Sequence, residues 1–176
     1  MDLVQIIANA INNISQAGIK LMLILGVMSG LIILMGHFAN IASRARRGQL
    51  QDGPGKIVGV ILIGGCLITL HSVMNATSNQ MALGDITFGA IAYVSEGKYG
   101  PAAVAINAVL TLLQWVGVIY AYQGGLRLRR SLKDGHTSLS AGDDVYSGIT
   151  RLIIGALLAA NPRLIDLIQN TIKLHW

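Results

Sequence analysis

The chain of 176 residues contains few charged side chains. Asp, Glu, Lys and Arg make up 12% of it, against about 25% in ordinary soluble domains, and hydrophobic residues make up 53%. The mean hydropathy is +0.59, and the apolar residues are gathered in runs too long for the core helices of a small soluble domain. This shortage of charge excludes an ordinary soluble domain and predicts an all-α membrane protein.

Residues and motifs that usually carry chemistry are also scarce. The single cysteine, Cys66, lies inside an apolar run, which excludes an intrachain disulfide and a Cys-based metal site. The sequence has no H-E-x-x-H, Walker A or G-x-S-x-G motif. His71, His136 and His175 have no Cys or carboxylate at ligand spacing. We therefore expect no enzyme, no catalytic residue and no metal.

Acidic residues are missing from the apolar runs, except for Asp166 near the end of the chain. Ion-coupled transporters usually need ionisable groups inside the membrane, so this class is disfavoured. His37 lies near the end of the first run and is compatible with metal or proton transfer, but we favour an ordinary interfacial or hydrogen-bonded histidine. The net charge of +5 is clustered in two loops, so no sequence-specific nucleic-acid binding is expected.

Four apolar runs predict four membrane spans, at Leu21–Ala42, Ile57–Val73, Ala102–Tyr122 and from Gly148 onward. The first, with 22 residues, is long enough to cross a hydrocarbon core of about 30 Å. Pro162 should kink or end the last helix, because proline lacks the N–H that the helix needs. The predicted fold is two tandem transmembrane helical hairpins.

The segments around these spans complete the predicted organisation. Residues 1–74 form an amphipathic helix plus the first hairpin, residues 75–101 an external connector, and residues 102–176 the second hairpin. The N-terminal helix is suited to the membrane interface or to a partner subunit. Its apolar face consists of Leu3, Ile6, Ile7, Ala10, Ile11 and Ile14. The apolar centre of the connector, Ile86 to Val94, is compatible with a short strand or a surface helix.

A basic motif occurs twice. Arg44-Ala45-Arg46-Arg47 returns 83 residues later as Arg127-Leu128-Arg129-Arg130, each time after an apolar run and before a polar loop with an Asp-Gly turn. Leu62-Ile63-Gly64 likewise returns 91 residues later as Ile153-Ile154-Gly155. This order indicates a duplicated hairpin with a basic tip.

The loop charges predict the orientation of the hairpins. The first loop, from Ser43 to Lys56, has four basic residues against one acidic residue. The second, from Arg127 through Arg151, has five against three. The positive-inside rule then places both arginine loops in the cytoplasm, with both termini and the connector outside. Met1-Asp2 supplies no positive n-region, so we expect the first span to act as an uncleaved insertion signal.

Two sets of residues are candidates for function. The basic set is expected to face lipid headgroups or a lumen, and the other interpretation is a topology signal that snorkels to phosphates. It consists of Arg44, Arg46, Arg47, Lys56, Arg127, Arg129, Arg130 and Lys133. The glycine set is expected where helices approach closely. It consists of Gly26 and Gly30, which form a G-x-x-x-G pair, with Gly64 and Gly155.

A short, nearly uncharged N-terminal segment followed twice by apolar helix, basic loop and apolar helix resembles the small membrane proteins of type IVB secretion and conjugation systems. The pattern is most similar to the TraQ type of IncI-like conjugative plasmids and to the DotE and DotP proteins. Each hairpin also resembles a conjugative pilin subunit, which has two apolar helices, a short basic cytoplasmic loop and outward termini. The basic loops at Arg44–Arg47 and Arg127–Arg130 and the Gly-rich spans carry these resemblances.

The resemblance implies a structural role in a bacterial conjugation or type IV secretion apparatus. In its most concrete form, a double-hairpin pilin-like protein polymerises with phospholipid into a filament or conduit. The implied partners are further copies of the chain, phospholipid as a structural ligand, and other membrane proteins of the apparatus. The implied location is the inner membrane and, after assembly, an extracellular pilus. An inner-membrane scaffold subunit and a small pore or holin-like channel remain as alternatives.

Overall fold

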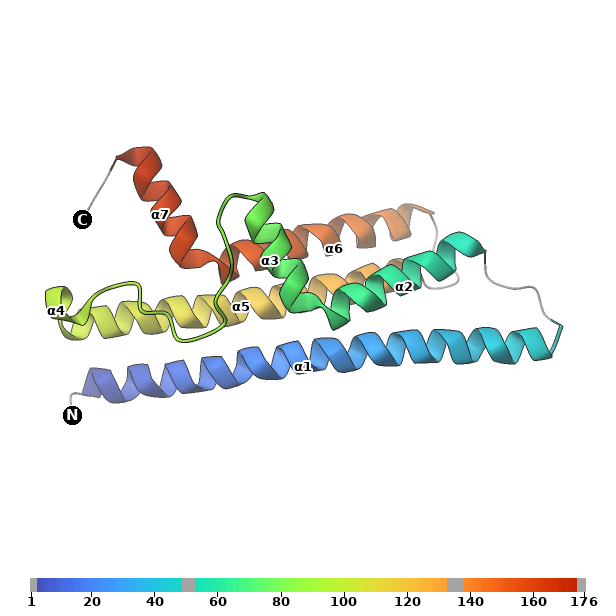
Figure 1. Ribbon diagram of the computed structural model, residues 1–176, viewed down its shortest axis with the longest axis horizontal. Helices are drawn as coiled ribbons and strands as arrows, with labels where there is room; N and C mark the ends of the chain where they lie inside the picture. Colours follow the sequence, from blue (N-terminus) through green and yellow to red (C-terminus); the bar gives the residue numbers. More distant parts are fainter. Residues whose placement is uncertain (1–2, 49–52, 133–137, 174–176) are drawn as a thin grey trace.

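The first helix, α1, runs without a break from Leu3 to Arg46 in the computed structural model, which describes residues 3–48, 53–132 and 138–173 (Figure 1). At 1.5 Å per residue its 44 residues extend over about 66 Å. The predicted amphipathic segment is thus not a separate helix but the first part of α1. No proline or glycine pair separates it from the first span, so the helix continues.

Each hairpin ends in a sharply bent pair of helices. Helix α2 (Pro54–Ile68) meets α3 (Leu70–Gln80) at 89°, and the pair formed by α6 (Ser138–Ala159) and α7 (Asn161–Ile172) is bent by 79°. The predicted break at Pro162 is confirmed, because the proline lies in the first turn of α7. The second predicted span, Ile57–Val73, is divided at Thr69, which the sequence analysis did not expect.

The two bends lie at equivalent positions of the sequence repeat. Thr69 and Ala160, the residues between the paired helices, are 91 residues apart, as are Gly64 and Gly155. Their backbone angles are similar, with φ −102° and ψ 31° at Thr69 and φ −90° and ψ 22° at Ala160. The repeat therefore includes the bent short helix as well as the hairpin arms.

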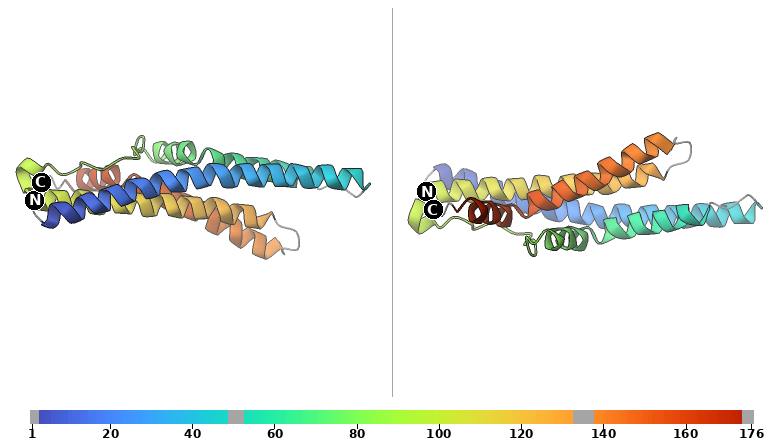
Figure 2. Two further views of the ribbon diagram at one scale, coloured as in Figure 1. Left: turned by 90° about the horizontal axis from the view of Figure 1, so that it is seen from below. Right: turned by 90° about the horizontal axis from the view of Figure 1, so that it is seen from above.

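The two hairpins lie side by side and open in the same direction. Helices α1 and α5 (Pro101–Ser131) run in one direction, and α2 and α6 return (Figures 1 and 2). The ends of α1 and α5 that carry the arginines lie at one end of the molecule, and α4 (Glu96–Tyr99) and the start of α1 lie at the other (Figure 1). Trp115 of α5 packs against Gly18 of α1, where a side chain would occupy the position of the indole.

The buried core lies between the hairpins and is built largely from small and aliphatic residues. One cluster joins residues of α1, α3, α5 and α6 with two connector residues, and a smaller one joins α1 and α2. The first contains Ile19, Leu70, Met74, Leu83, Ile86, Val118, Ala121, Ala156, Ala159 and Ala160. The second contains Ile33, Val60 and Leu67. Alanines in the contact between α5 and α6 let these two backbones approach closely.

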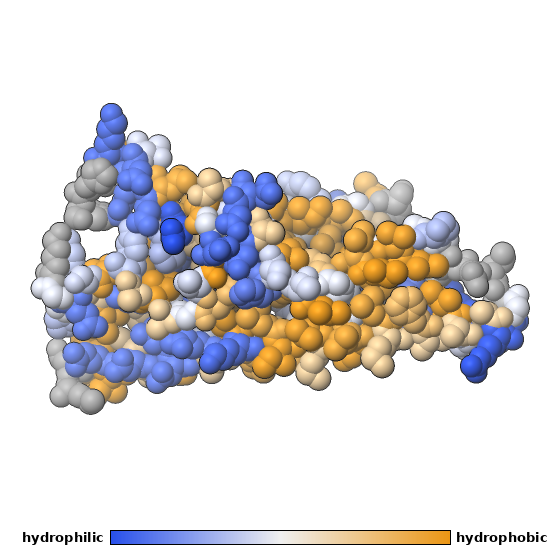
Figure 3. Space-filling view, in the orientation of Figure 1, coloured by the Kyte–Doolittle hydropathy of each residue, from blue (hydrophilic) through white to orange (hydrophobic). Residues whose placement is uncertain are grey.

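The described part of the chain contains helices and irregular segments but no strand. Helices α1 and α5 are each long and apolar enough to cross a membrane, and the two bent pairs pass the same test when each is taken as one span. The chain thus has between two and four candidate spans by length and composition. On the face that Figure 3 shows, apolar surface covers the middle of the molecule toward the arginine end, and the opposite end is mostly hydrophilic.

The connector is neither the strand nor the surface helix that its composition allowed. Residues 83–95 form an irregular segment that runs along α5 to the short helix α4. Asn107 of α5 holds its end: Asn107 Oδ1 accepts bonds from the N–H groups of Tyr93 (3.0 Å) and Val94 (2.9 Å), and Asn107 Nδ2 donates to the Val94 carbonyl (2.9 Å). Asn107, which lies within the third predicted span, thus forms the hydrogen bonds that a helix or sheet would otherwise provide to the backbone of Tyr93 and Val94.

Two further polar residues of α5 extend this clamp along the same helix face. Thr111 Oγ1 accepts a bond from the Ile91 N–H (3.1 Å), and Gln114 Nε2 donates to the Thr87 carbonyl (2.7 Å). Because residues four and seven positions beyond Asn107 share its face, the three side chains form a ladder. These side chains thus supply hydrogen-bond partners to backbone groups of the irregular connector, which has no regular element to pair with.

Candidate functional site

The arginine clusters belong to helices more than to loops. Helix α1 includes Arg44 and Arg46 in its last turn, and α5 continues through the second cluster to Ser131. The predicted loop boundaries at Ser43 and Arg127 were therefore wrong, because α1 continues to Arg46 and α5 continues through the whole second cluster. Cationic side chains near a helix C-terminus also interact favourably with its dipole. Lys56, which was also predicted to lie in a loop, belongs to the first turn of α2.

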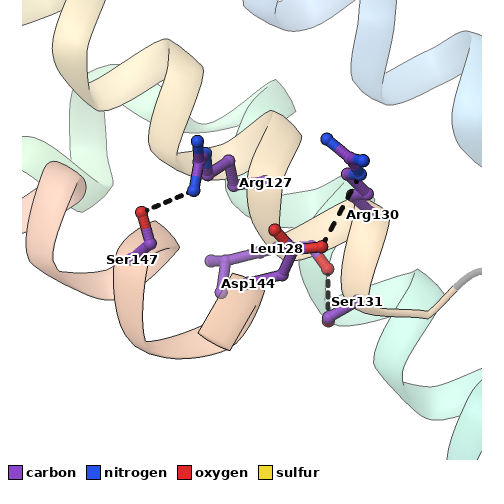
Figure 4. Close-up of polar contacts among 6 residues, drawn as sticks. All are labelled: Arg127, Leu128, Arg130, Ser131, Asp144 and Ser147. Carbon is purple, nitrogen blue, oxygen red and sulfur yellow. Dashed lines mark hydrogen bonds and ion pairs between the residues drawn. The ribbon is translucent and has the colours of Figure 1, made fainter. Parts of the chain in front are cut away.

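Two arginines of the second cluster contact the opposite arm of their own hairpin. Arg127 Nη1 donates to Ser147 Oγ (2.9 Å), and Arg130 Nε lies 3.7 Å from Asp144 Oδ2 (Figure 4). The Arg130 side chain is 64% exposed, so this ion pair is worth at most about 1 kcal/mol. These contacts join the ends of α5 and α6.

Arg129, the third arginine of this cluster, lies in a different environment. It lines a cavity of about 280 Å³ between the two hairpins, together with His37 and Asn40 of α1 and Lys56 of α2. The remaining lining residues are apolar: Ile32, Ile33, Gly36, Val60 and Leu132. The fold thus brings together Lys56 and Arg129, which the sequence placed in separate loops. We call this space the interhairpin cavity.

His37 has a particular position in the interhairpin cavity. Its Nε2 atom is closed to solvent and has no hydrogen-bond partner among the described residues. The prediction of an ordinary interfacial or hydrogen-bonded histidine stays a prediction, and a hydrogen bond of Nε2 is not part of it among the described residues. Asn40, which was not a candidate from the sequence, lies three positions from His37 and therefore on the same face of α1.

The other basic candidates lie outside the cavity lining. Arg46 and Arg47 are exposed at the end of α1, and Arg44 is half-buried there. Lys133 lies outside the described residues. The seven basic side chains of the sequence prediction that the structure describes are therefore not one cluster: two line the interhairpin cavity, two join α5 to α6, and three lie at the end of α1.

The four candidate packing glycines all lie where helices approach closely. A Cβ atom added to Gly30 would lie 2.6 Å from the Gly64 carbonyl oxygen, and one on Gly26 would lie 3.0 Å from that of Leu67. A Cβ on Gly64 would lie 2.6 Å from Cγ of Leu34. On Gly155 it would lie 2.6 Å from the Ala121 nitrogen. Three of these four contacts are with backbone atoms.

Three more glycines at the contact between α5 and α6 were missed from the sequence. A Cβ on Gly117 would lie 2.6 Å from the Gly155 oxygen, and one on Gly124 would lie 2.7 Å from the Gly148 oxygen. The spacing of these glycines could have indicated the contact. Gly117 and Gly124 are seven residues apart, and so are Gly148 and Gly155. Seven residues make nearly two turns, which places each pair on one face.

At the opposite end of the molecule, α7 packs against the connector, where Tyr93 makes polar contacts with Asp166 and, at 3.4 Å, with Gln169 Oε1. The Tyr93 hydroxyl donates to Asp166 Oδ1 (2.8 Å). Burial, and then the hydrogen bond to the Asp166 carboxylate, raise the pKa of Tyr93 above its ordinary value. Asp166, the acidic residue that interrupts the last apolar run, thus has a partner within the chain.

Other observations add little chemistry to this picture. Within the described residues, no group of three His, Cys, Asp or Glu side chains is placed to hold a metal ion. No protein-family model, curated protein or solved structure matches the chain.

Proposed function

We propose that the chain is a structural subunit of a bacterial conjugation or type IV secretion apparatus and crosses the inner membrane as two tandem hairpins. The observation that carries this proposal is the parallel arrangement of the hairpins, with both arginine-bearing helix ends at one end of the molecule (Figures 1 and 2). Two cytoplasmic basic tips in one subunit agree with the positive-inside rule. Two parallel hairpins with basic ends support a structural subunit of an assembly better than they support an enzyme.

In the proposed topology, each bent pair supplies one span and one interfacial helix. Helix α2 has 15 residues, about 22 Å, and is short for a bilayer core of about 30 Å. Snorkelling of Lys56 and local thinning of the bilayer accommodate this mismatch. Helices α3 and α7 then lie near the outer interface, where α7 exposes Leu167, Ile168 and Ile172.

The exposed surface of α1 supports self-assembly within the bilayer. Ile24, Met28, Leu31 and Met35 are 57%, 54%, 46% and 70% exposed and follow one another at helical spacing. In the pilin-like version of the proposal, this face contacts neighbouring copies and the acyl chains of phospholipid. The small residues that bring α5 and α6 together keep each subunit rigid while α1 remains available.

The fate of the protein in cells tests this proposal. Surface filaments sheared from cells that express the complete apparatus should contain this chain as a main component, bound to phospholipid. Cells that express the chain alone serve as the control and should yield no filaments. Retention in the inner membrane together with the apparatus would replace the pilin version by the scaffold alternative. Absence from both filaments and apparatus would contradict the proposal.

A further inference from the structure

We propose that a cavity between α4, α5 and α7 binds a primary ammonium group that carries an apolar chain. The cavity has a volume of about 600 Å³ and lies at the end of the molecule opposite the arginines (Figure 1). We call it the tyrosine cavity. Its walls combine one carboxylate, two tyrosine rings and three aliphatic side chains, contributed by Asp166, Tyr93, Tyr99, Val94, Ile106 and Ile165. This inference goes beyond the proposed function and does not depend on it.

The charge of the tyrosine cavity favours a cation. Asp166 Oδ1 accepts the bond from the Tyr93 hydroxyl, whereas Asp166 Oδ2 has no partner among the described residues and is not closed to solvent. None of the described residues that line the cavity is basic. Arg163 lines a neighbouring cavity beside α7 but forms no ion pair with Asp166 in the described part of the chain. A carboxylate beside apolar walls is stabilised by a cation that also donates hydrogen bonds, which an ammonium group does.

Tyr93 fixes the orientation of this carboxylate. Its hydroxyl donates to Asp166 Oδ1 (2.8 Å) and lies 3.4 Å from Gln169 Oε1. Its backbone N–H donates to Asn107 Oδ1 (3.0 Å), so residue 93 is held at both the backbone and the hydroxyl. The raised pKa of Tyr93 keeps this hydroxyl protonated as a donor. One carboxylate oxygen is thus bound within the chain, and the other remains to accept a bond from a ligand N–H.

The walls of the tyrosine cavity fit an ammonium group with a hydrocarbon chain better than a metal ion. The faces of tyrosine rings attract cations, and a single carboxylate does not supply the several oxygen ligands that Ca²⁺ or Mg²⁺ requires. The volume equals about twenty water molecules, which is room for the ammonium group and a short chain. Ile106 lines the cavity and is 45% exposed, so it leads the chain out over the surface of α5.

Two substitutions test the carboxylate and the space separately, each with a matched control. Asp166→Asn removes the charge but keeps an oxygen that accepts the Tyr93 bond, and Asp85→Asn removes a charge outside the cavity while keeping an acceptor for Asn79. Ile106→Trp fills the cavity. Leu112→Trp adds the same side chain to α5 at an exposed position that does not line the cavity.

Isothermal titration calorimetry of the purified full chain in a nonionic detergent measures binding of hexylammonium. Hexanol lacks the charge, ethylammonium lacks the chain, and titration of protein-free micelles gives the partitioning to subtract. The wild type should bind hexylammonium about tenfold more tightly than either analogue. Asp166→Asn and Ile106→Trp should each weaken binding about tenfold, and both control variants should bind like the wild type. Circular dichroism checks that each variant keeps its helices.

The ammonium group could come from a phospholipid head group or from a free amphiphilic amine. Dihexanoyl phosphatidylethanolamine separates these sources. Competition with hexylammonium at similar concentration assigns the cavity to the lipid head group, and absence of competition assigns it to a free amine. Either result supports an ammonium site when the carboxylate substitution weakens binding as expected.

Three results would overturn the inference. They are equal binding of hexanol and hexylammonium, which would indicate an apolar crevice only, equal binding by Asp166→Asn and the wild type, and an equal loss in Asp85→Asn, which would indicate an effect of net charge. The proposed function is tested separately, by the presence of the chain in filaments or in the apparatus. A chain that binds hexylammonium in this cavity but is absent from both would retain the site and refute the proposed function.

Discussion

Single residues act in this protein mainly in two ways. Small residues let two helices approach closely, and polar side chains form hydrogen bonds with backbone groups that lack a partner in a regular element. Gly117 and Gly155 let α5 and α6 approach until the backbone of one helix lies where a side chain of the other would be. Asn107 has the opposite role, because its amide replaces three missing backbone partners of the connector. In both cases the residue type is dictated by a contact with another element and not by local helix propensity.

The close contact between α5 and α6 at Gly155 predicts that Gly155→Ala and Gly65→Ala change the free energy of unfolding in opposite directions. Gly155→Ala places a Cβ 2.6 Å from the Ala121 nitrogen, so α5 and α6 must separate, and we expect a loss of about 1–3 kcal/mol in the free energy of unfolding. Gly65→Ala has open space and should stabilise by about 0.4–1 kcal/mol. Unfolding in mild detergent measures both. Equal effects would mean that α5 and α6 do not make this contact.

The connector clamp predicts the effect of Asn107→Ala. The change leaves the N–H groups of Tyr93 and Val94 unpaired, so we expect a loss of about 2–3 kcal/mol and faster amide hydrogen exchange in residues 86–94. The control Asn79→Ala removes an exposed bond to Asp85 and should cost less than about 1 kcal/mol. Unchanged exchange in the connector would show that other groups hold it.

At the scale of the element, the bends decide how each hairpin ends. Both occur at equivalent repeat positions, yet only the second has a proline beside it. Near the second bend, Asn161 Nδ2 donates to the Leu110 carbonyl (2.7 Å), and Gln114 Nε2 reaches the Ala159 carbonyl (3.3 Å). At the first bend the Thr69 hydroxyl donates to the Gly65 carbonyl (2.8 Å). Side-chain bonds therefore accompany both bends.

From this we predict that Pro162→Ala keeps the bend between α6 and α7. The tertiary bonds to α5 remain, and the proline-free bend at Thr69 shows that the geometry does not require proline. Spin labels at Ile149 and Leu167, both exposed, report the angle through their distance. Asn161→Ala in the Pro162→Ala background should then allow straightening. A longer distance in the single variant would assign the bend to the proline alone.

At the scale of the whole molecule, the hairpins place both basic ends together, and this leads to a topology prediction. Cysteines at Gly48 and Leu139, in a Cys66→Ser background, should be protected from an impermeant thiol reagent applied to intact cells before assembly. A cysteine at Gln80 should be labelled, because it lies in the outer part of the proposed topology and is exposed. Ser78 is unsuitable as a reporter, since it is fully buried and bonded to the Gly84 carbonyl. Labelling at only one of the two protected positions would refute parallel hairpins.

The sequence by itself determined the features that depend on neighbouring residues. The apolar runs predicted helices of membrane character, and Pro162 predicted a break because proline cannot donate the required backbone bond. The repeat of the arginine motif and of Gly64 and Gly155 predicted two related hairpins, and equivalent bends now extend that repeat. Local periodicity and helix breakers carry this information along the chain.

Only the tertiary structure decided which distant residues meet. His37, Lys56 and Arg129 are separated by 19 and 73 positions in the sequence and line one cavity, and Asn107 clamps a connector that no periodic pattern describes. The continuous helix α1 and the bend at Thr69 were likewise unexpected. Such features depend on how the two hairpins pack, because a side chain selects its partner only after the helices have set the distance and direction between them.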